Sequence, residues 1–342
     1  MAVSASSTPI WQGKRVTLLN TAGSIQYTVK TETPDETIFA GLATNRPGET
    51  SVSVELFDIL APHLRQTIPD IYGVYDDDDA VIEASNFARR FILTPSGGSA
   101  QNIDVRANYS YGKGSPTLDS EPVFLELPIG APLPGSVRYA PAGNVLLKRT
   151  ATTIRTLSNA AAGAINVAFD TMDDVSDGNV LRIQYPSGTN GVSGNVYGPS
   201  WTMRTRCRDE YVLYYVNAFG GIDALWLRGI CRRADAFERE EAGVYRLMGD
   251  NTLPDARISR IDTAVTWDLN TGWLTDAQSR VFSRNVPGTP CAYLLKLGTD
   301  AGGWPVKVID ASMQHGRTTE SNGRTPVNYT LNVQLLQDRP RL

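Results

Sequence analysis

The sequence predicts an all-β, or at least β-dominated, fold with two or more antiparallel β-sandwich-like domains and one or two short helices. Two observations support this. Short runs alternate apolar and polar residues, and turns rich in Gly, Pro, Asn and Asp separate them. In 51–60 (SVSVELFDIL), Val52, Val54 and Leu56 alternate with Ser and Glu. Successive side chains of a strand point to opposite faces, so this pattern is typical of a strand with one buried face.

In the first part of the chain, further strands are predicted at 15–20, 24–32 and 122–129. The segment 130–136 (GAPLPGS) then interrupts the pattern with Pro and Gly, which are common in exposed linkers. At 342 residues the chain is long enough for about two domains. We therefore expect an N-terminal β domain over 1–135 and a C-terminal β domain over 136–342.

The second part of the chain continues the strand pattern, with β-branched residues throughout. The predicted strands are 144–158, 164–172, 179–186, 291–297, 306–314 and 327–337. Between them, 186–200 (PSGTNGVSGNVYGPS) is a Gly/Ser/Asn-rich loop longer than most connections in compact domains. Loops of this length are often either contact surfaces or without fixed structure.

One helix is predicted near 275–286. Thr275 can cap its first turn, and Gln278 stands three residues later, as a capping box requires. Val281 and Phe282 are expected to face inward from the same helix.

The segment 209–230 (DEYVLYYVNAFGGIDALWLRGI) predicts a hairpin that turns at Gly220 and Gly221. Both faces of its first strand are apolar or aromatic, whereas a strand with one exposed face would carry polar residues on that face. Either two layers of one domain cover the hairpin, or one face meets a second chain. In the second case the interface residues would be Tyr211, Tyr214, Tyr215, Phe219, Trp226 and Arg228.

Charge and composition narrow the function classes. A net charge of −4 and a pI near 5.4 argue against binding nucleic acid through bulk positive charge. No apolar run reaches the roughly 18 residues of a membrane helix, and the N-terminus lacks a secretory signal pattern. We expect a soluble protein, made in the cytoplasm, that does not insert into membranes. Of the 32 basic residues 26 are Arg, which suits contacts with carboxylates across interfaces or reflects genomic base composition.

No motif in the sequence points to catalysis. Only His63 and His315 are present, the three cysteines form no CxxC pair, and the acidic run 76–79 misses the calcium-loop spacing. HExxH, GxSxG and the phosphate-binding GxxxxGK motif are absent from the sequence. The sequence therefore predicts no enzyme, no cofactor, and no catalytic or metal-binding residues.

Four segments carry a resemblance to a known group. Residues 209–230, 263–278 (TAVTWDLNTGWLTDAQ) and 328–334 (NYTLNVQ) resemble the C-terminal half of tail proteins of Bacteroidetes phages and prophages, and 38–64 resembles their early segment. The resemblance does not extend to the middle section, about 136–200. It implies a structural protein of the virion tail, in the tail tip, baseplate or distal-tail ring. It also implies assembly with other copies and with other tail proteins around the tail axis.

Three hypotheses follow. The first is a tail structural subunit that acts by oligomeric assembly. The second is a receptor- or carbohydrate-binding tail module, for which the loop 186–200 and Trp304 are the candidate contacts. The third is a glycan hydrolase, because two suitably spaced carboxylates are all that such an enzyme needs.

Overall fold

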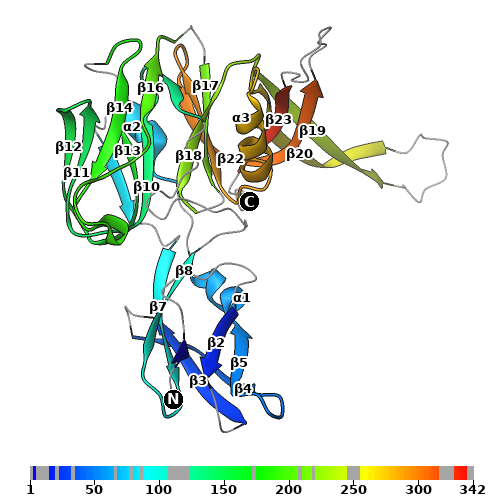
Figure 1. Ribbon diagram of the computed structural model, residues 1–342. Coiled ribbons are helices and arrows are strands. Elements are labelled where there is room, and N and C mark those ends of the chain that lie inside the picture. The colour runs from blue at the N-terminus through cyan, green and yellow to red at the C-terminus, as the bar shows by residue number, and fades with distance from the viewer. Residues whose placement is uncertain are drawn as a thin grey trace, which may run out of the picture.

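The structure is a computed structural model. It describes residues 3–4, 15–19, 23–31, 35–64, 68–76, 80–84, 88–106, 124–171, 175–206, 210–217, 220–244, 255–315 and 327–336. Strands in several mostly antiparallel sheets dominate these residues, so the predicted all-β fold is confirmed (Figure 1). The buried apolar residues form three core clusters, which we call the N-terminal, middle and C-terminal cores.

Two antiparallel sheets enclose the N-terminal core. One has the order β1-β2-β5 and the other β4-β3-β7-β8. Their strands are β1 (Val3–Ser4), β2 (Arg15–Leu19), β3 (Ser24–Thr31), β4 (Thr37–Thr44), β5 (Ser51–Glu55), β7 (Ala88–Pro95) and β8 (Gln101–Arg106). After β5 come the helix α1 (Phe57–Leu60) and the 3-10 turn η1 (Ala61–His63), so the strand predicted over 51–60 ends five residues early. Leu56, Phe57 and Leu60 are all buried, and their spacing is helical.

The middle core lies beside a six-stranded sheet and a three-stranded sheet. The first has the order β12-β11-β14-β16-β9, with β15 paired to β14, and the second is β10-β13-β6. All pairings are antiparallel except β16 with β9. The strands are β6 (Ala80–Ala84), β9 (Glu126–Pro128), β10 (Leu133–Ala140), β11 (Gly143–Arg149), β12 (Thr152–Ala160), β13 (Gly163–Phe169), β14 (Val180–Tyr185), β15 (Val196–Tyr197) and β16 (Trp201–Arg204), with the 3-10 turn η2 (Thr189–Gly191).

The predicted boundary between residues 135 and 136 falls inside β10 and does not separate two cores. The helix α2 (Ile71–Asp76) and β6 both precede it, yet Ile71 packs in the middle core and β6 pairs with β13. The Pro/Gly segment itself is buried. A Cβ on Gly135 would collide with the side chains of Tyr185 and Ile183, so here Gly serves close packing rather than an exposed linker.

A seven-stranded antiparallel sheet carries the C-terminal core, in the order β18-β17-β21-β22-β23-β20-β19. Its strands are β17 (Glu210–Val216), β18 (Ile222–Leu227), β19 (Arg232–Val244), β20 (Asp255–Asn270), β21 (Ala292–Leu297), β22 (Gly302–His315) and β23 (Val327–Leu335). The predicted helix is confirmed as α3 (Asp276–Asn285), with its capping box. It packs on this sheet through Phe282, whose ring stacks on Tyr329 at 4.2 Å (Figure 1).

Two other segments differ in detail from the prediction. The strand expected over 144–158 is the hairpin β11–β12, which turns at Thr150 with a positive φ of 51°. The strand predicted over 306–314 begins four residues earlier than expected, because β22 starts at Gly302.

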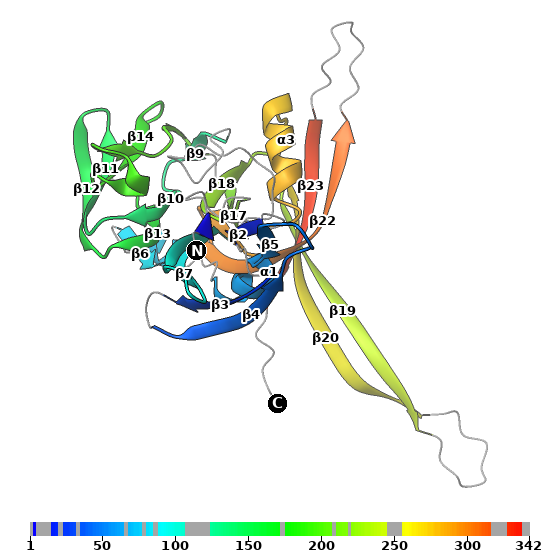
Figure 2. The ribbon, with the colours of Figure 1, turned by 60° about the horizontal axis from the view of Figure 1, so that its bottom comes forward.

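The strands β19 and β20 extend from the sheet as a two-stranded arm. They pair along their length from Arg232–Asp268 to Val244–Asp255, whereas β20 pairs with β23 only over 266–270. Figures 1 and 2 show the arm leaving the body of the molecule. The hairpin β22–β23 leaves the same sheet in another direction (Figure 2).

Candidate functional site

The hairpin β17–β18 lies between two cores. Val212, Tyr214, Ile222 and Ala224 pack in the middle core, and Leu213, Tyr215, Leu225 and Leu227 pack in the C-terminal core. Of the two alternatives drawn from the sequence, the structure therefore has the first. Layers of the same chain cover both faces of the hairpin.

This burial bears on the predicted interface residues. Tyr214 and Tyr215 are fully buried within the chain, so in this conformation neither can contact a second copy. Phe219 lies outside the described residues. Tyr211 and Trp226 are half-buried and Arg228 is exposed. The guanidinium of Arg228 lies 4.2 Å from the ring centre of Trp226, a cation–π contact that holds the arginine at the surface.

The polar groups inside the hairpin differ in how well they are satisfied. The Tyr214 hydroxyl donates to the carbonyl of Pro132 at 2.7 Å, whereas the buried Tyr215 hydroxyl has no hydrogen-bond partner among the described residues. The carboxylate of Asp223 accepts from the Asn217 side chain at 2.9 Å. Burial nevertheless raises the pKa of Asp223 to about 7, because a charged carboxylate is poorly solvated there.

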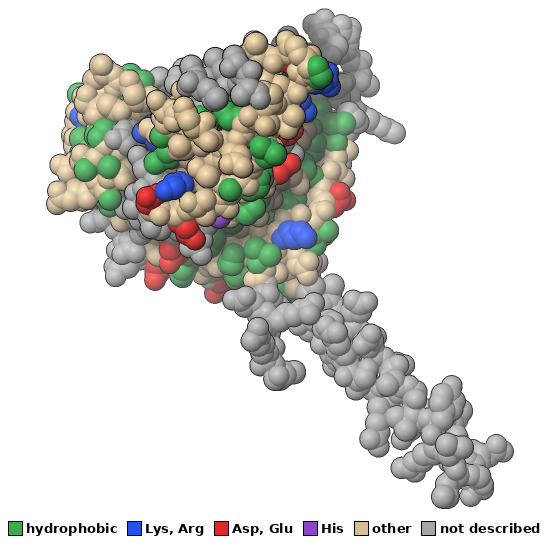
Figure 3. Space-filling model, turned by 90° about the horizontal axis from the view of Figure 1, so that it is seen from below, with side chains coloured by type: hydrophobic (Ala, Val, Ile, Leu, Met, Phe, Trp, Pro, Cys, Tyr) green, Lys and Arg blue, Asp and Glu red, His purple; other side chains and the backbone are tan. Residues whose placement is uncertain are grey.

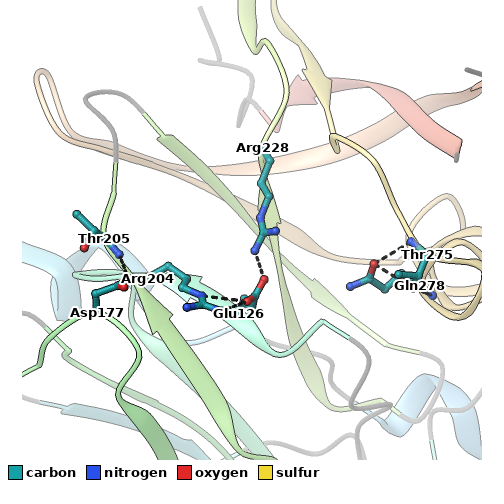
Figure 4. Close-up of polar contacts among 7 residues, drawn as sticks. All are labelled: Glu126, Asp177, Arg204, Thr205, Arg228, Thr275 and Gln278. Carbon is teal, nitrogen blue, oxygen red and sulfur yellow. Dashed lines mark hydrogen bonds and ion pairs between the residues drawn. The ribbon is translucent and has the colours of Figure 1, made fainter.

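Arg228 is also part of a charged cluster that Figure 4 shows. Glu126 on β9 accepts from Arg204 on β16 through Oε1, at 3.0 Å from Nε and 2.8 Å from Nη2. Its second oxygen, Oε2, accepts from Arg228, which follows β18. The two arginines lower the pKa of Glu126 by hydrogen bonding to its charged form, Arg228 more than Arg204. Glu126 thereby joins the six-stranded sheet to the seven-stranded one.

A groove of about 620 Å³ lies next to this cluster, at the base of the arm. The residues that line it come from the segment between β18 and β19, the start of β19, the end of β20, the segment before α3 and the start of β23. They are Arg228, Gly229, Ile230, Arg232, Asp268, Asn270, Gly272, Trp273, Asn328 and Thr330. Trp273 is 59% exposed and Ile230 is 72% exposed.

The strand alternation explains why polar residues line the floor of the groove. Trp267 and Leu269 of β20 point into the C-terminal core, so Asp268 and Asn270 point to the opposite face of the sheet. On the neighbouring strand Thr330 stands opposite Asn270. This face of the sheet lies under the middle core at β17 and β18 but carries the groove at β20 and β23.

Two glycines allow the loops to close around the groove. A Cβ on Gly229 would collide with the side chain of Asn270. Gly272 has a φ of +69°, a conformation that residues with a Cβ rarely adopt, and a Cβ there would lie 3.0 Å from that of Arg228. Asn270 also accepts from the Gly272 amide at 2.8 Å, which fixes its side-chain oxygen.

Trp304, the sequence-based candidate for a sugar contact, belongs to the edge of the C-terminal core. Its ring lies 5.3 Å from that of Trp267, and it is half-buried. The predicted loop 186–200 forms η2 and β15, and it is not part of the groove.

The sequence prediction missed Trp273 and Arg232. The available signal was a tryptophan in the turn-like stretch 270–274 (NTGWL), where a side chain is less often buried than in a strand.

The remaining sequence candidates lie apart from one another. His63 sits in η1 against the ring of Phe91, and His315 ends β22. Cys231 and Cys291 are thiols that form no disulfide, and burial raises the pKa of Cys231 to about 11. Cys207 lies outside the described residues. Of the acidic run 76–79, only Asp76 is described.

Within the part of the chain that the structure describes, no group of three or more His, Cys, Asp or Glu could hold a metal ion. The described helices are all too short or too polar to span a membrane. Figure 3 shows acidic and basic side chains interspersed on the face of the molecule seen from below.

Comparison with known proteins gives no match: no family model, curated protein or solved structure is similar to this chain.

Proposed function

We propose that the protein is a structural subunit of a bacteriophage tail, in the tail tip, baseplate or distal-tail ring, and that it acts by assembling with other copies and other tail proteins. The arm formed by β19 and β20 is the observation that carries the assembly part of this proposal. The phage context rests on the resemblance of 209–230, 263–278 and 328–334 to phage tail proteins.

The physical reason concerns the stability of an isolated β-ribbon. Over 255–265, β20 pairs with β19 alone among the described strands. At the rise per residue of an extended chain, this part of the ribbon is roughly 35 Å long. A two-stranded hairpin is marginally stable in water without a third strand or a packed face. The unpaired edges of such a hairpin also leave backbone donors and acceptors open to pairing with another chain. A neighbouring subunit that covers the arm would satisfy both needs.

The body of the molecule suits a mechanical role. The hairpin β17–β18 is buried on both faces, and Glu126 ties two sheets together, so the base of the arm is part of a rigid unit. Force applied to the arm would therefore reach the middle core through packed strands rather than through a flexible linker.

The test is to measure assembly of the full chain and of a variant without the arm. Replacing 237–263 by Asn-Gly keeps the paired residues Ala236 and Ala264 and joins their strands through a two-residue turn. The control replaces 316–326 by the same two residues, between the paired His315 and Val327 of the other projecting hairpin. Light scattering and negative-stain images over a concentration series give the size of the particles.

We expect the wild-type chain and the control to form oligomers and the arm-deleted variant to stay monomeric, with the same far-ultraviolet circular dichroism per remaining residue. A wild-type chain that is monomeric at every concentration and forms no ring or tube would contradict the proposal. Equal assembly with and without the arm would also contradict it.

A further inference from the structure

We propose that the groove at the base of the arm, lined by Trp273, Ile230, Arg232, Asp268 and Asn270, binds a saccharide. This inference concerns a surface other than the arm and does not rest on the proposed assembly. It also assigns the sugar contact to Trp273 rather than to the half-buried Trp304.

The first support is the indole of Trp273. It is the one strongly exposed tryptophan among the described residues, and its ring has no aromatic or cationic partner among them. A large ring left in water at a concave site is an apolar surface that a ligand can cover. The C–H face of a pyranose ring fits such a surface, because it is flat and apolar while its edge carries the hydroxyl groups.

The second support is the set of hydrogen-bonding groups around that ring. Asp268 accepts from the Asn332 side chain through Oδ1 at 2.9 Å, and its Oδ2 has no partner among the described residues. Arg232 has no ion-pair partner among the described residues and can only donate. The Asn328 and Thr330 side chains can donate and accept, and the Asn328 Oδ1 atom is buried with no partner among the described residues.

This mixture of groups discriminates between classes of ligand. Sugar hydroxyls both donate and accept, so they can satisfy Asp268 and Arg232 at the same time. A phosphate or a nucleic-acid backbone would meet the carboxylate of Asp268 as a like charge. An apolar peptide side chain would bury Asp268 and Arg232 without hydrogen bonds, which is unfavourable.

The third support is size and preorganisation. About 620 Å³ lies within the roughly 300–1,000 Å³ that is typical of small-ligand sites. One wall is fixed before a ligand arrives, because Glu126 and the ring of Trp226 hold Arg228. The floor is fixed as well, because the Gly272 amide holds the Asn270 side chain. Groups held in place in this way lose little conformational entropy on binding.

The experiment uses the full-length chain and a panel of immobilised oligosaccharides containing neutral hexoses, N-acetylhexosamines or uronic acids. Any sugar that binds is then titrated in solution by calorimetry. The variants are Trp273→Ala and Asp268→Asn, with Leu42→Ala as the control, because Leu42 is 64% exposed and lies in β4, outside the groove. We expect the wild type and Leu42→Ala to bind the same sugars, and both groove variants to bind at least about tenfold more weakly.

A wild-type chain that binds no member of the panel overturns the inference, as does a sugar bound equally well by Trp273→Ala. Oligomer size is measured on the same samples. If Trp273→Ala changes that size and the wild type binds no sugar, the groove is a contact between protein chains instead. Assembly of the wild type without sugar binding rejects the saccharide site and leaves the proposed structural role standing, so the two failures are distinguishable.

Discussion

Glu126 and Arg228 form an ion pair that joins two sheets of the molecule. Glu126 lies on β9 at the edge of the six-stranded sheet, and Arg228 directly follows β18 at the edge of the seven-stranded sheet. Arg204 donates to the other oxygen of the same carboxylate, so one acidic side chain serves two guanidinium groups. Arg228 in turn lines the groove, which couples the position of the groove wall to the contact between the sheets.

Breaking this pair is expected to destabilise the chain modestly. In a double-mutant cycle of Glu126→Gln and Arg228→Gln, we expect a coupling free energy of about 0.5–1 kcal/mol, because both side chains are partly exposed. The coupling should shrink in about 0.5 M salt, which screens such pairs. Since the pKa of Glu126 is lowered in the folded chain, the contribution is present above the ordinary carboxyl pKa and lost as the pH falls through the lowered one. Urea unfolding of the four proteins measures this, and a coupling near zero would contradict it.

Two adjacent tyrosines should respond differently to the loss of a hydroxyl. Tyr214→Phe removes the donor to the Pro132 carbonyl and leaves that buried acceptor unpaired, at a cost of about 1–2 kcal/mol in the free energy of unfolding. Tyr215→Phe removes a buried hydroxyl that has no partner among the described residues, so we expect no loss, or a gain of up to about 1 kcal/mol. Each variant is the volume-matched control for the other, and equal destabilisation by both in urea unfolding would contradict the expectation.

Local features of the fold could be predicted from the sequence. The strand β3 and the capping box of α3 both follow from residues that are near neighbours in the chain. The pairing of β6 with β13 could not be predicted, because alternation identifies a strand but not its partner. For the same reason the Pro/Gly segment 130–136 suggested a linker. Only the approach of Tyr185 to Gly135, fifty positions apart in the chain, explains the glycine.

The candidate site shows the same limit. Trp273 and Trp304 both follow glycine in turn-like stretches, so the sequence does not rank them. The fold does, because Trp304 packs beside Trp267 whereas Trp273 is 59% exposed. The groove residues come from five segments of the C-terminal sheet and its loops, and strand pairing alone brings Asn270 and Thr330 together. No local pattern encodes that proximity.

The cap of α3 offers a test of a feature that the sequence did predict. Thr275 accepts from the Gln278 amide at 3.3 Å, and the Gln278 side chain accepts from the Thr275 amide at 3.0 Å. Thr275→Ala should lower the free energy of unfolding by about 1 kcal/mol, because a first-turn amide loses its acceptor. Thr275→Ser keeps the hydroxyl and should lose little. Thermal unfolding followed by circular dichroism compares the two, and equal losses would show that the methyl group rather than the cap matters.

Asp223 should make the stability of the chain depend on pH in the range between the ordinary pKa of an aspartate, 3.8, and about 7. Its folded pKa is raised, so the folded chain holds this proton more tightly than the unfolded chain. The favourable contribution to the free energy of unfolding is complete below pH 3.8 and is lost as the pH rises to about 7, by about 1.4 kcal/mol per pH unit at most.

Asp223→Asn keeps a side-chain oxygen for the amide of Asn217 and carries no charge. We expect it to be more stable than the wild type at pH 8, by more than about 1 kcal/mol, and equal to it near pH 4. Urea unfolding at a series of pH values from 4 to 8 gives the free energy of unfolding of each protein. If this free energy changes with pH in the same way for the wild type and Asp223→Asn, then the buried carboxyl group does not control the pH dependence.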